Sequence, residues 1–195
     1  MLPDGYHDLP PGKIASVVTY LEMRTPPPSM DLTLPPGLSI VKAQPDPAAY
    51  REVFRAAGEN WLWFSRLAMP DDQLIEILSH PSVDIFFLIR DSQPIGLAEL
   101  DRRHRPDVEL AFLGIVPSEI GKGLGRILIH HAIQAAWSHQ PVRLWLHTCT
   151  LDHPAALGFY QRAGFKPYRR AVEIAPDPRL TGKLPLEAAP QVPCL

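Results

Sequence analysis

Between residues 38 and 174 the hydrophobic positions follow two alternating patterns. Short runs rich in β-branched and aromatic residues predict strands, whereas apolar residues that recur every three or four positions predict amphipathic helices. Strands are expected at 38–43, 83–90, 95–103, 108–116, 142–149 and 165–174, and helices at 47–57, 71–79, 123–139 and 154–163. The order β-α-α-β-β-β-α-β-α-β predicts a mixed α/β (α+β) domain with hairpins in its middle, not a purely parallel doubly wound sheet.

Proline is concentrated outside this patterned middle. The chain has 195 residues and 23 prolines, of which ten lie in residues 1–47, eight in 48–170 and five in 171–195. Because proline lacks an N–H and fixes φ, neither end is expected to hold a long helix or a central strand. Residues 13–24 contain a β-branched stretch and are expected to form an extra strand or an ordered arm, packed on the domain or on a second subunit.

These patterns divide the chain into three parts. We expect an N-terminal proline-rich extension over residues 1–37, one folded domain over 38–174, and a C-terminal proline-rich tail over 175–195 that wraps the surface or stays mobile. The middle is long enough for one ordinary domain and too short for two typical ones.

Composition and charge narrow the classes of function. Lys and Arg number 19 and Asp and Glu 21, which gives a net charge of −2. This charge disfavours a protein that binds mainly to the nucleic-acid backbone. No apolar run approaches the roughly 18 residues that span a bilayer, and the first residues lack a secretory signal pattern. We therefore expect a cytoplasmic protein without nucleic-acid or membrane partners.

A metal site is not expected either. Cys149 and Cys194 provide neither a disulfide framework nor a zinc spacing. His130 and His131 have no carboxylate or cysteine companion at metal-binding spacing, so we expect both to be solvated surface residues. Cys149 is expected to be a small core residue, and nothing in the sequence argues for a covalent acyl-enzyme.

The sharpest local feature is the glycine-rich turn IGKGLG at residues 120–125, between a predicted strand and the longest predicted helix. Glycine reaches positive φ and lets the backbone approach a ligand, and the free N–H groups of a helix N-terminus attract anions. Lys122 and Arg126 can add positive charge. The turn therefore suits a phosphate, although the glycines could equally serve only a tight strand–helix connection. It fits neither a Walker A loop nor a Rossmann fingerprint.

With the strand ELAFLGIVP (109–117) before it, this turn resembles the acetyl-CoA loop of the GNAT superfamily of N-acetyltransferases, usually Arg/Gln-x-x-Gly-x-Gly/Ala. Here Gly123 and Gly125 match, and Ile120 stands at the Arg/Gln position. The segment DHPAALGFYQRAGF (152–165) resembles the family's later Asn-x-x-Ala-x-x-x-Tyr-x-x-x-Gly-Phe pattern, with His153 at the Asn position. The resemblance covers roughly residues 38–174 and implies the GNAT-like acyl-CoA N-acyltransferase fold.

The resemblance also implies where acetyl-CoA, as co-substrate, would bind. Its extended arm would lie between strands 108–116 and 142–149, with backbone groups of the first strand on pantetheine and on the acetyl carbonyl. The residues expected to bind it are Leu113, Gly114, Ile115, Val116, Gly121, Lys122, Gly123, Leu124, Gly125, Arg126, His153 and Tyr160. Gly114 has no side chain to block the ligand, although a β-bulge or a sheet contact would explain a glycine there as well.

Two residues are candidates for acid–base catalysis. The resemblance implies that Tyr160 protonates the departing thiolate, whereas the alternative is a tyrosine packed in the core beside Phe159 and Phe165. An alkyl amine is protonated at pH 7 and must lose a proton before it attacks a thioester. Glu109 is the first candidate for the base, and the alternative is a solvated charge at the strand end. Reserve candidates for the base are Glu99, His104 and His147, the last of which more often would be a packed histidine. A helix cap is expected from Asp152 or His153, before Pro154 at the helix start.

The leading hypothesis is an enzyme that moves the acetyl group of acetyl-CoA to a primary amine of a small molecule or peptide by direct attack. Trp61, Trp63 and Phe64 are expected either to line the acceptor site or to cap the core. The alternatives are a sensor that binds CoA without turnover, transfer of a longer acyl group, and a toxin-type enzyme that acetylates aminoacyl-tRNA, which the charge disfavours. A homodimer stays open.

Overall fold

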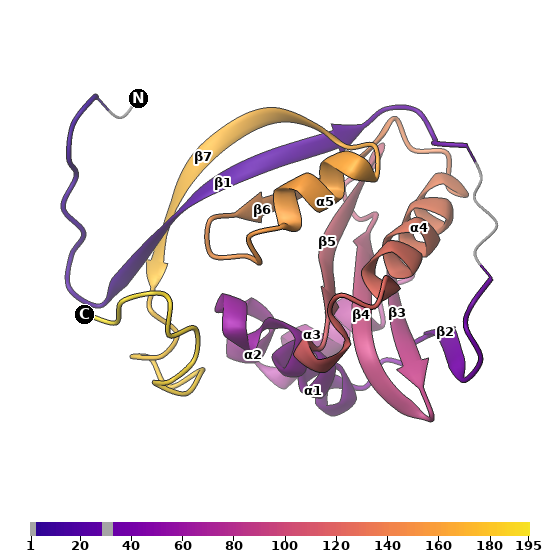
Figure 1. The fold of residues 1–195 in the computed structure, drawn as a ribbon, viewed down its shortest axis with the longest axis horizontal. Helices are drawn as coiled ribbons and strands as arrows, with labels where there is room; N and C mark the ends of the chain where they lie inside the picture. The colour runs from indigo at the N-terminus through magenta and orange to yellow at the C-terminus, as the bar shows by residue number, and fades with distance from the viewer. Residues whose placement is uncertain (1–2, 29–32) are drawn as a thin grey trace.

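The computed structural model describes residues 3–28 and 33–195, and its centre is one seven-stranded sheet in the order β2-β3-β4-β5-β6-β1-β7 (Figure 1). The strands are β1 Lys13–Met23, β2 Leu38–Lys42, β3 Val83–Arg90, β4 Gln93–Asp101, β5 Asp107–Ile115, β6 Arg143–Cys149 and β7 Lys166–Pro176. The helices are α1 Pro47–Gly58, α2 Ser65–Ala68, α3 Asp71–Leu78, α4 Leu124–Trp137 and α5 Ala156–Arg162, with 3₁₀ segments η1 Glu59–Trp61 and η2 Pro117–Glu119. Each element expected between residues 38 and 174 is present within two residues of its predicted ends, so the mixed α/β fold class is confirmed.

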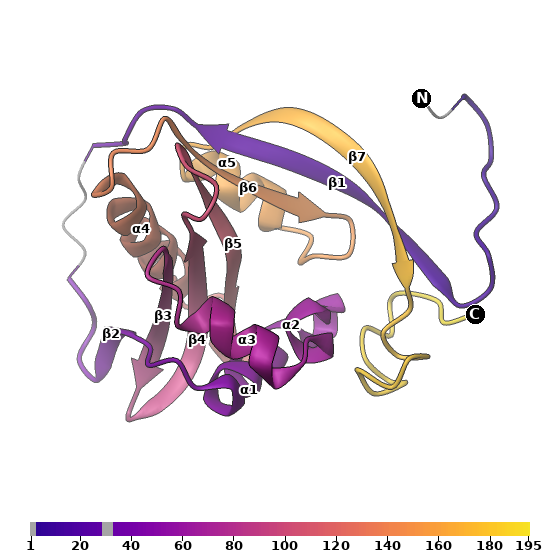
Figure 2. The same cartoon turned by 180° about the vertical axis from the view of Figure 1, so that it is seen from behind.

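Helices cover both faces of the sheet. The buried residues Tyr50, Phe54 and Leu74 join α1 and α3 to β3 and β4 on one face. On the other face α4 packs through Leu128, Ile129 and other apolar residues into a second core, which Phe165 and the partly buried residues of α5 extend. Figures 1 and 2 show α4 and α5 beside the sheet from opposite sides. In this three-layer arrangement α1, α3 and α4 each bury one apolar stripe, as the 3.6-residue periodicity requires.

The sheet opens at its centre. Neighbouring strands are antiparallel except β5 and β6, which run parallel and pair only over Asp107–Glu109 and Arg143–Trp145. Past Glu109 the two strands diverge (Figure 1). This divergence leaves backbone groups of the last part of β5 available to a ligand, because strand pairing is what normally consumes them.

The expectation that neither proline-rich end holds a central strand was wrong for the N-terminal end. β1 is an interior strand, antiparallel to β6 on one side and to β7 on the other. The physical reason is the placement of the prolines: Pro11 and Pro26 flank the strand, and no proline lies between them. Each N–H from Lys13 to Met23 can therefore join a ladder, which an average proline content does not reveal. The apolar residues Leu21 and Met23 reach the core beneath α4 and α5.

The C-terminal residues 177–195 fold into a coil packed beside the start of β1 (Figure 1). Leu184, Ala188 and Ala189 form a small apolar cluster with Ile14 and Leu62. Arg179 is the centre of this coil. Its guanidinium pairs with Asp177 at 2.7 Å and donates to the carbonyl groups of Ala188, Ala189, Val192 and Pro193.

The described residues contain no helix that is both long and apolar enough to cross a bilayer. Among these residues no group of three or more His, Cys, Asp or Glu side chains is arranged to hold a metal ion. Cys149 and Cys194 are both free thiols.

Candidate active site

A cavity of about 790 Å³ opens where β5 leaves β6, between the end of β5, the start of α4 and one side of α5. Its walls come from segments far apart in the sequence. They include Ala57, Trp61, Trp63, Leu113, Gly114, Ile115, Glu119, Ile120, Gly121, Gly123, Gly125, Arg126, Ile129, His130, Asp152, His153, Ala155, Ala156, Phe159, Tyr160, Arg162 and Ala163. The lining extends from the glycine turn to the tryptophans of the α1–α2 connection, and the volume is in the range of small-molecule and cofactor sites.

The glycine turn lines the cavity and is a tight connection between β5 and α4. Gly121 and Gly123 have φ of 84° and 78°, a conformation that other residues rarely adopt. Added Cβ atoms at these two positions would meet nothing within 4 Å, so the backbone is open to a ligand. Gly123 is the N-cap of α4 and provides no side-chain cap, which leaves the first N–H groups of the helix directed out of it. The turn is tight and its geometry suits an anion.

Charged groups surround the turn in an arrangement that the sequence did not predict. Lys122 pairs with Glu119 at 3.2 Å, and Arg90 pairs with the same carboxylate at 3.0 Å. Glu119 itself lines the cavity, as do Arg126 of α4 and Arg162 of α5. Leu124 points into the core and is buried, so only its backbone is available to a ligand. Val116 packs partly buried against the same core.

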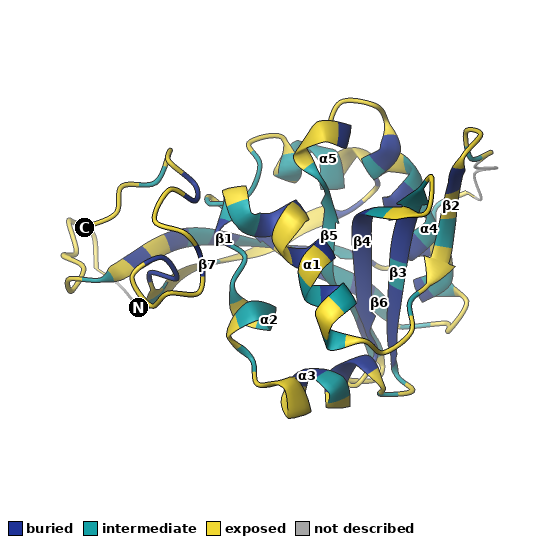
Figure 3. Cartoon of the chain, turned by 90° about the horizontal axis from the view of Figure 1, so that it is seen from below, coloured by how far each residue is buried: buried dark blue, intermediate teal, exposed yellow. Residues whose placement is uncertain are grey.

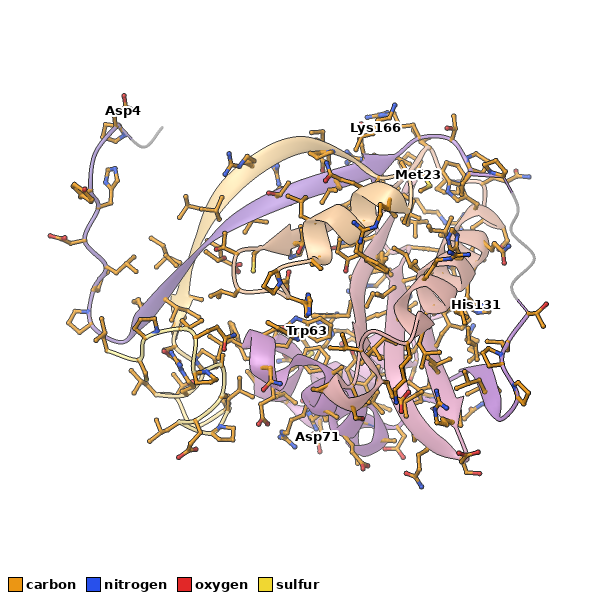
Figure 4. The ribbon with its side chains drawn as sticks, viewed as in Figure 1. Asp4, Met23, Trp63, Asp71, His131 and Lys166 are labelled. Carbon is orange, nitrogen blue, oxygen red and sulfur yellow. The ribbon has the colours of Figure 1, made fainter. Side chains whose placement is uncertain are left out.

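His130 and His131 are half-buried, so the expectation of a solvated pair was wrong. His130 lines the cavity, and the ring of His131 stands edge-on to Phe86 at 4.7 Å. Figure 4 places His131 on α4 beside β3. Burial lowers the pKa of both histidines, and the charge of Arg126 lowers that of His130 further. Two consecutive histidines face different sides of a helix, and the buried apolar residues Ile129 and Ala132 on either side of them were the signal that the pair is not fully exposed.

Gly114 lines the cavity, but the side on which a Cβ would lie is filled by protein. A Cβ at Gly114 would lie 2.9 Å from Trp63 Cη2 and 3.0 Å from the Cβ of Ala57. Gly58 is equally required, because a Cβ there would lie 2.5 Å from the Trp63 ring. Trp63 therefore sits in a slot between α1 and β5, and its ring also contacts Phe54 and Phe112, with centroids 5.3 Å away in each case. Trp63 both caps the core and borders the cavity (Figure 4).

Asp152 joins the two sides of the cavity. Its carboxylate accepts hydrogen bonds from Trp63 Nε1 at 3.2 Å, from Thr148 Oγ1 at 2.7 Å and from the N–H of Cys149 at 2.9 Å. It closes the end of β6 and does not cap α5, which begins at Ala156 with Ala155 as N-cap. Burial raises the pKa of the Cys149 thiol, but Cys149 is only half-buried and is not one of the core residues, so the expectation of a core cysteine was wrong.

His153 does not cap the helix either, so both cap predictions were wrong. Its Nδ1 accepts the N–H of Ala155 at 3.0 Å, and its ring stands edge-on to Trp61 at 5.1 Å. Trp61 and His153, which both line the cavity, are thus in contact with each other. Phe64 is half-buried immediately before α2.

Tyr160 lines the cavity and also packs on the core, so the two interpretations of this residue are compatible. Its ring is edge-on to Phe159 at 5.3 Å and to Phe165 at 6.3 Å. Burial, and then the negative charge of Asp152, raises the pKa of the phenol above its ordinary value. The hydroxyl therefore keeps its proton at neutral pH.

Glu109 lies on β5 before the point where the strands diverge, five residues from Gly114. Its side chain is 21% exposed, and Oε1 is 3.7 Å from Nδ1 of His147 on β6. Burial, followed by the negative charges of Asp101 and Glu99, raises its pKa to about 7. A carboxylate that titrates near neutral pH is suited to exchange protons, because it is present in both forms there. It is not one of the cavity-lining residues, so contact with a bound ligand would need water or an approach from the other sheet face.

The reserve candidates occupy different surroundings. Glu99 is completely buried and accepts hydrogen bonds from Tyr50 Oη and from Arg66 Nη2, each at 2.5 Å. Its oxygens are committed to these partners, so it is poorly placed to accept a proton from a ligand. His104 is exposed in the turn between β4 and β5. His147 is the reserve candidate that lies beside Glu109.

A family model described as Acetyltransferase (GNAT) family matches residues 50–165. That range covers more than half of the chain and includes β5, the glycine turn, α4, β6 and α5. No curated protein matches the sequence.

Solved structures with the same fold come from several bacteria. A GCN5-related N-acetyltransferase from Kribbella flavida is 18% identical with a TM-score of 0.57, and the alignment covers 88% of this chain and 63% of that one. A putative acetyltransferase of the GNAT family from Novosphingobium aromaticivorans is 17% identical with a TM-score of 0.60, covering 85% and 67%. An acetyltransferase from Thermus thermophilus is 20% identical with a TM-score of 0.53, covering 71% and 96%. The chain thus spans under two thirds of the Kribbella protein, and at these identities the likeness is one of fold.

Proposed function

The chain belongs to the GNAT acetyltransferase family, and on that premise we propose that it transfers the acetyl group of acetyl-CoA to a primary amine by direct attack within a ternary complex. The observation that supports this best is the cavity where β5 leaves β6, because it joins the glycine turn at one end to Tyr160 and the tryptophans at the other. An elongated, phosphate-bearing thioester fits such a cavity. The acceptor is a small molecule or a peptide amine.

The glycine turn would hold the pyrophosphate. Gly121 and Gly123 leave their backbone open, and the N-terminus of α4 adds a partial positive charge. Arg126 of α4 and Arg162 of α5 also line the cavity and would add full charges for the remaining phosphate. Lys122 is already paired with Glu119, so its contribution would be smaller.

The divergent part of β5 would orient the reactive end. Leu113, Gly114 and Ile115 line the cavity, and a backbone N–H aimed at the acetyl oxygen would stabilise charge that develops there. The N–H of Val116 already donates to the carbonyl of Ile95 at 2.9 Å, so Val116 would contribute its carbonyl group. Acetyl-CoA supplies an activated acetyl group as a thioester. Trp63 fills the space over Gly114 and would limit how far that group can enter.

Glu109 would act as the base, through water, on an amine that arrives protonated. Its raised pKa, about 7, gives a comparable amount of acid and base form at neutral pH, which is the condition for efficient general base catalysis. Tyr160 would return a proton to the departing thiolate. Because its pKa is raised, this transfer is uphill and its contribution is expected to be modest.

The first experiment is binding followed by turnover. Acetyl-CoA at about 100 times its Kd should stabilise the protein by about 2.7 kcal/mol, a rise in Tm of roughly 5–11 °C for a chain of this size. Release of free thiol should then be followed over a panel of primary amines. Absence of a shift with millimolar acetyl-CoA or CoA would contradict the proposal as a whole.

A non-catalytic CoA sensor is the second candidate. Two departures favour it: Ile120 is exposed in place of an Arg or Gln side chain, and the Nδ1 of His153 is occupied by the N–H of Ala155. A clear thermal shift without thiol release over a broad amine panel would select the sensor. Thiol release with longer acyl-CoA but not with acetyl-CoA would instead indicate transfer of a longer acyl group.

A further inference from the structure

The outer side of β7 is a long strand edge without a partner among the described residues. β7 spans Lys166–Pro176, pairs with β1 on one side and ends the strand order (Figure 1). The other edge of the sheet is β2, which has only five residues and ends in Lys42. Short edges that carry lysine are protected against pairing, whereas a long edge presents a row of free N–H and C=O groups. β7 is therefore the edge that can accept another strand.

The side chains of β7 also leave apolar surface in water. Tyr168, Val172 and Ile174 are 42%, 49% and 57% exposed, and β7 is yellow or teal along its length in Figure 3. Pro167 and Pro176 stand near the two ends, so the stretch between them has an N–H at each residue. A free edge with β-branched and aromatic side chains and no internal proline is the pattern of a strand that pairs with another chain.

We propose that β7 pairs antiparallel with β7 of a second copy of this chain, about a two-fold axis at Ala171, so that two sheets join edge to edge. In that register Arg169 of each copy faces Glu173 of the other. Arg169 lies on the same sheet face as Tyr20, since its guanidinium carbon is 3.7 Å from the centroid of that ring. Glu173 shares the face, because pairing with β1 is regular from Arg169 to Glu173.

The charges select this register and this partner. A two-fold axis at Arg169, Arg170 or Glu173 would place identical charges directly opposite each other, which destabilises a strand pair. An axis at Val172 would leave both Arg169 and Glu173 without an opposite charge. Only the axis at Ala171 gives two ion pairs, and the small side chain of alanine lets the strands approach at the axis. A sequence that complements itself in this way fits a second copy of the same chain better than an unrelated strand.

Charge reversal tests the register. Sedimentation velocity at micromolar concentrations should show a dimer for the full chain. Arg169→Glu and Glu173→Arg should each raise the dimer Kd by about tenfold or more, because each creates two like-charge pairs across the axis. The double variant R169E/E173R should restore dimerisation, since it exchanges the two charges. Thermal denaturation of each variant controls for folding. A monomeric wild type, a dimer insensitive to both single reversals, or a double variant that stays dissociated would overturn the proposal.

A cross-link tests the axis without disturbing charge. Residues directly opposite in an antiparallel pair have Cα atoms about 4.5–5.5 Å apart, within the range of a disulfide. In a Cys194→Ser background, which removes the exposed native thiol, Ala171→Cys should form a covalent dimer on mild oxidation. The matched control is Ile174→Cys on the same strand, which would face Tyr168 of the partner and should cross-link little. Equal cross-linking of the two variants, or none with Ala171→Cys, would contradict an axis at Ala171.

Discussion

The carboxylate of Glu109 lies 3.7 Å from the imidazole Nδ1 of His147, across the last residues over which β5 and β6 run side by side. The parallel ladder ends at Glu109, which pairs with Trp145. A carboxylate with a pKa of about 7 is thus held at the point where the sheet opens, with an imidazole nitrogen 3.7 Å away.

The pH dependence of turnover follows from Glu109. If Glu109, with a pKa of about 7, is the base, kcat/KM should rise with pH up to about 7. Above that pH, ionisation of Glu109 is complete and should cause no further rise in kcat/KM. Glu109→Gln should lower kcat by roughly 100-fold at pH 8, where the wild-type carboxylate is ionised, and by less at pH 5.5, where it is protonated. Stopped thiol-release assays across this range measure both effects. His147→Gln is the matched control and should shift the midpoint without abolishing the rate.

The same residue predicts a change in stability. The folded-state pKa of Glu109 is raised above its unfolded value, so the native state binds the proton more tightly and the protein loses stability as pH rises from about 4.5 to about 7. Glu109→Gln removes this loss. Its Tm should therefore match that of the wild type near pH 4.5 and exceed it by a few degrees at pH 8. Equal Tm values at pH 8 would show that the carboxylate is better solvated than its surroundings suggest.

Tyr160→Phe separates the proton-donor role from packing. Phenylalanine keeps the ring contacts with Phe159 and Phe165 and removes only the hydroxyl. We expect kcat to fall by roughly 10- to 100-fold, at the low end of acid catalysis because the phenol pKa is raised. The thermal shift with CoA should stay the same. An unchanged kcat would leave Tyr160 as a packing residue alone.

Gly114 is predicted to be required by Trp63. A Cβ at this position would lie 2.9 Å from the Trp63 ring and 3.0 Å from Ala57, so Gly114→Ala should destabilise the protein by about 1–3 kcal/mol and shift tryptophan fluorescence. Gly125→Ala is the matched control, since its Cβ would meet Phe159 at an ordinary 3.6 Å. Trp63→Phe should relieve much of the penalty of Gly114→Ala in the double variant. If the unfolding free-energy changes of the two substitutions were additive in the double variant, the Trp63 ring would not be the cause of the destabilisation.

The sequence was enough to predict the helices, most strands and the glycine turn, but not which strands pair when they are far apart in the chain. The periodicity of Leu124, Leu128 and Ala132 was enough to predict α4, and the positive φ of Gly121 and Gly123 followed from their residue type. The interior position of β1 depends on pairing with β6, more than a hundred residues away, and no local pattern encodes that. A strand's hydrophobic alternation states which face is buried, not which neighbour it has.

For the candidate site too, residues in short motifs were predicted, and residues placed by long-range packing were not. The glycine turn and Tyr160 were found because each belongs to a short motif. Glu119 and Arg162 were missed because their place in the cavity depends on how η2 and α5 fold against α4. Gly114 was expected to leave room for a ligand or to serve a β-bulge or sheet contact, and its contact with Trp63, fifty-one residues earlier in the chain, was not expected.

Arg179 is predicted to organise the whole C-terminal coil. The side chains of Arg179 and Asp177 are each only 2% exposed, and hydrogen bonding to the guanidinium, against the effect of burial, lowers the pKa of Asp177. Arg179→Ala would leave that carboxylate buried without its partner and four carbonyl groups without their donor, a loss of about 3–5 kcal/mol. Because the folded-state pKa of Asp177 is depressed, the wild-type contribution is present at neutral pH and is lost as pH falls below about 4. Arg179→Lys keeps the charge but cannot reach several carbonyls at once, so it should rescue little.

Since Gln191 donates to the carbonyl of Asn60 beside Trp61, release of the coil should also raise KM for the acceptor more than it lowers kcat. Thermal denaturation at pH 7 and pH 3.5, together with steady-state kinetics of both variants, measures these effects, and full rescue by lysine would show that charge alone is sufficient.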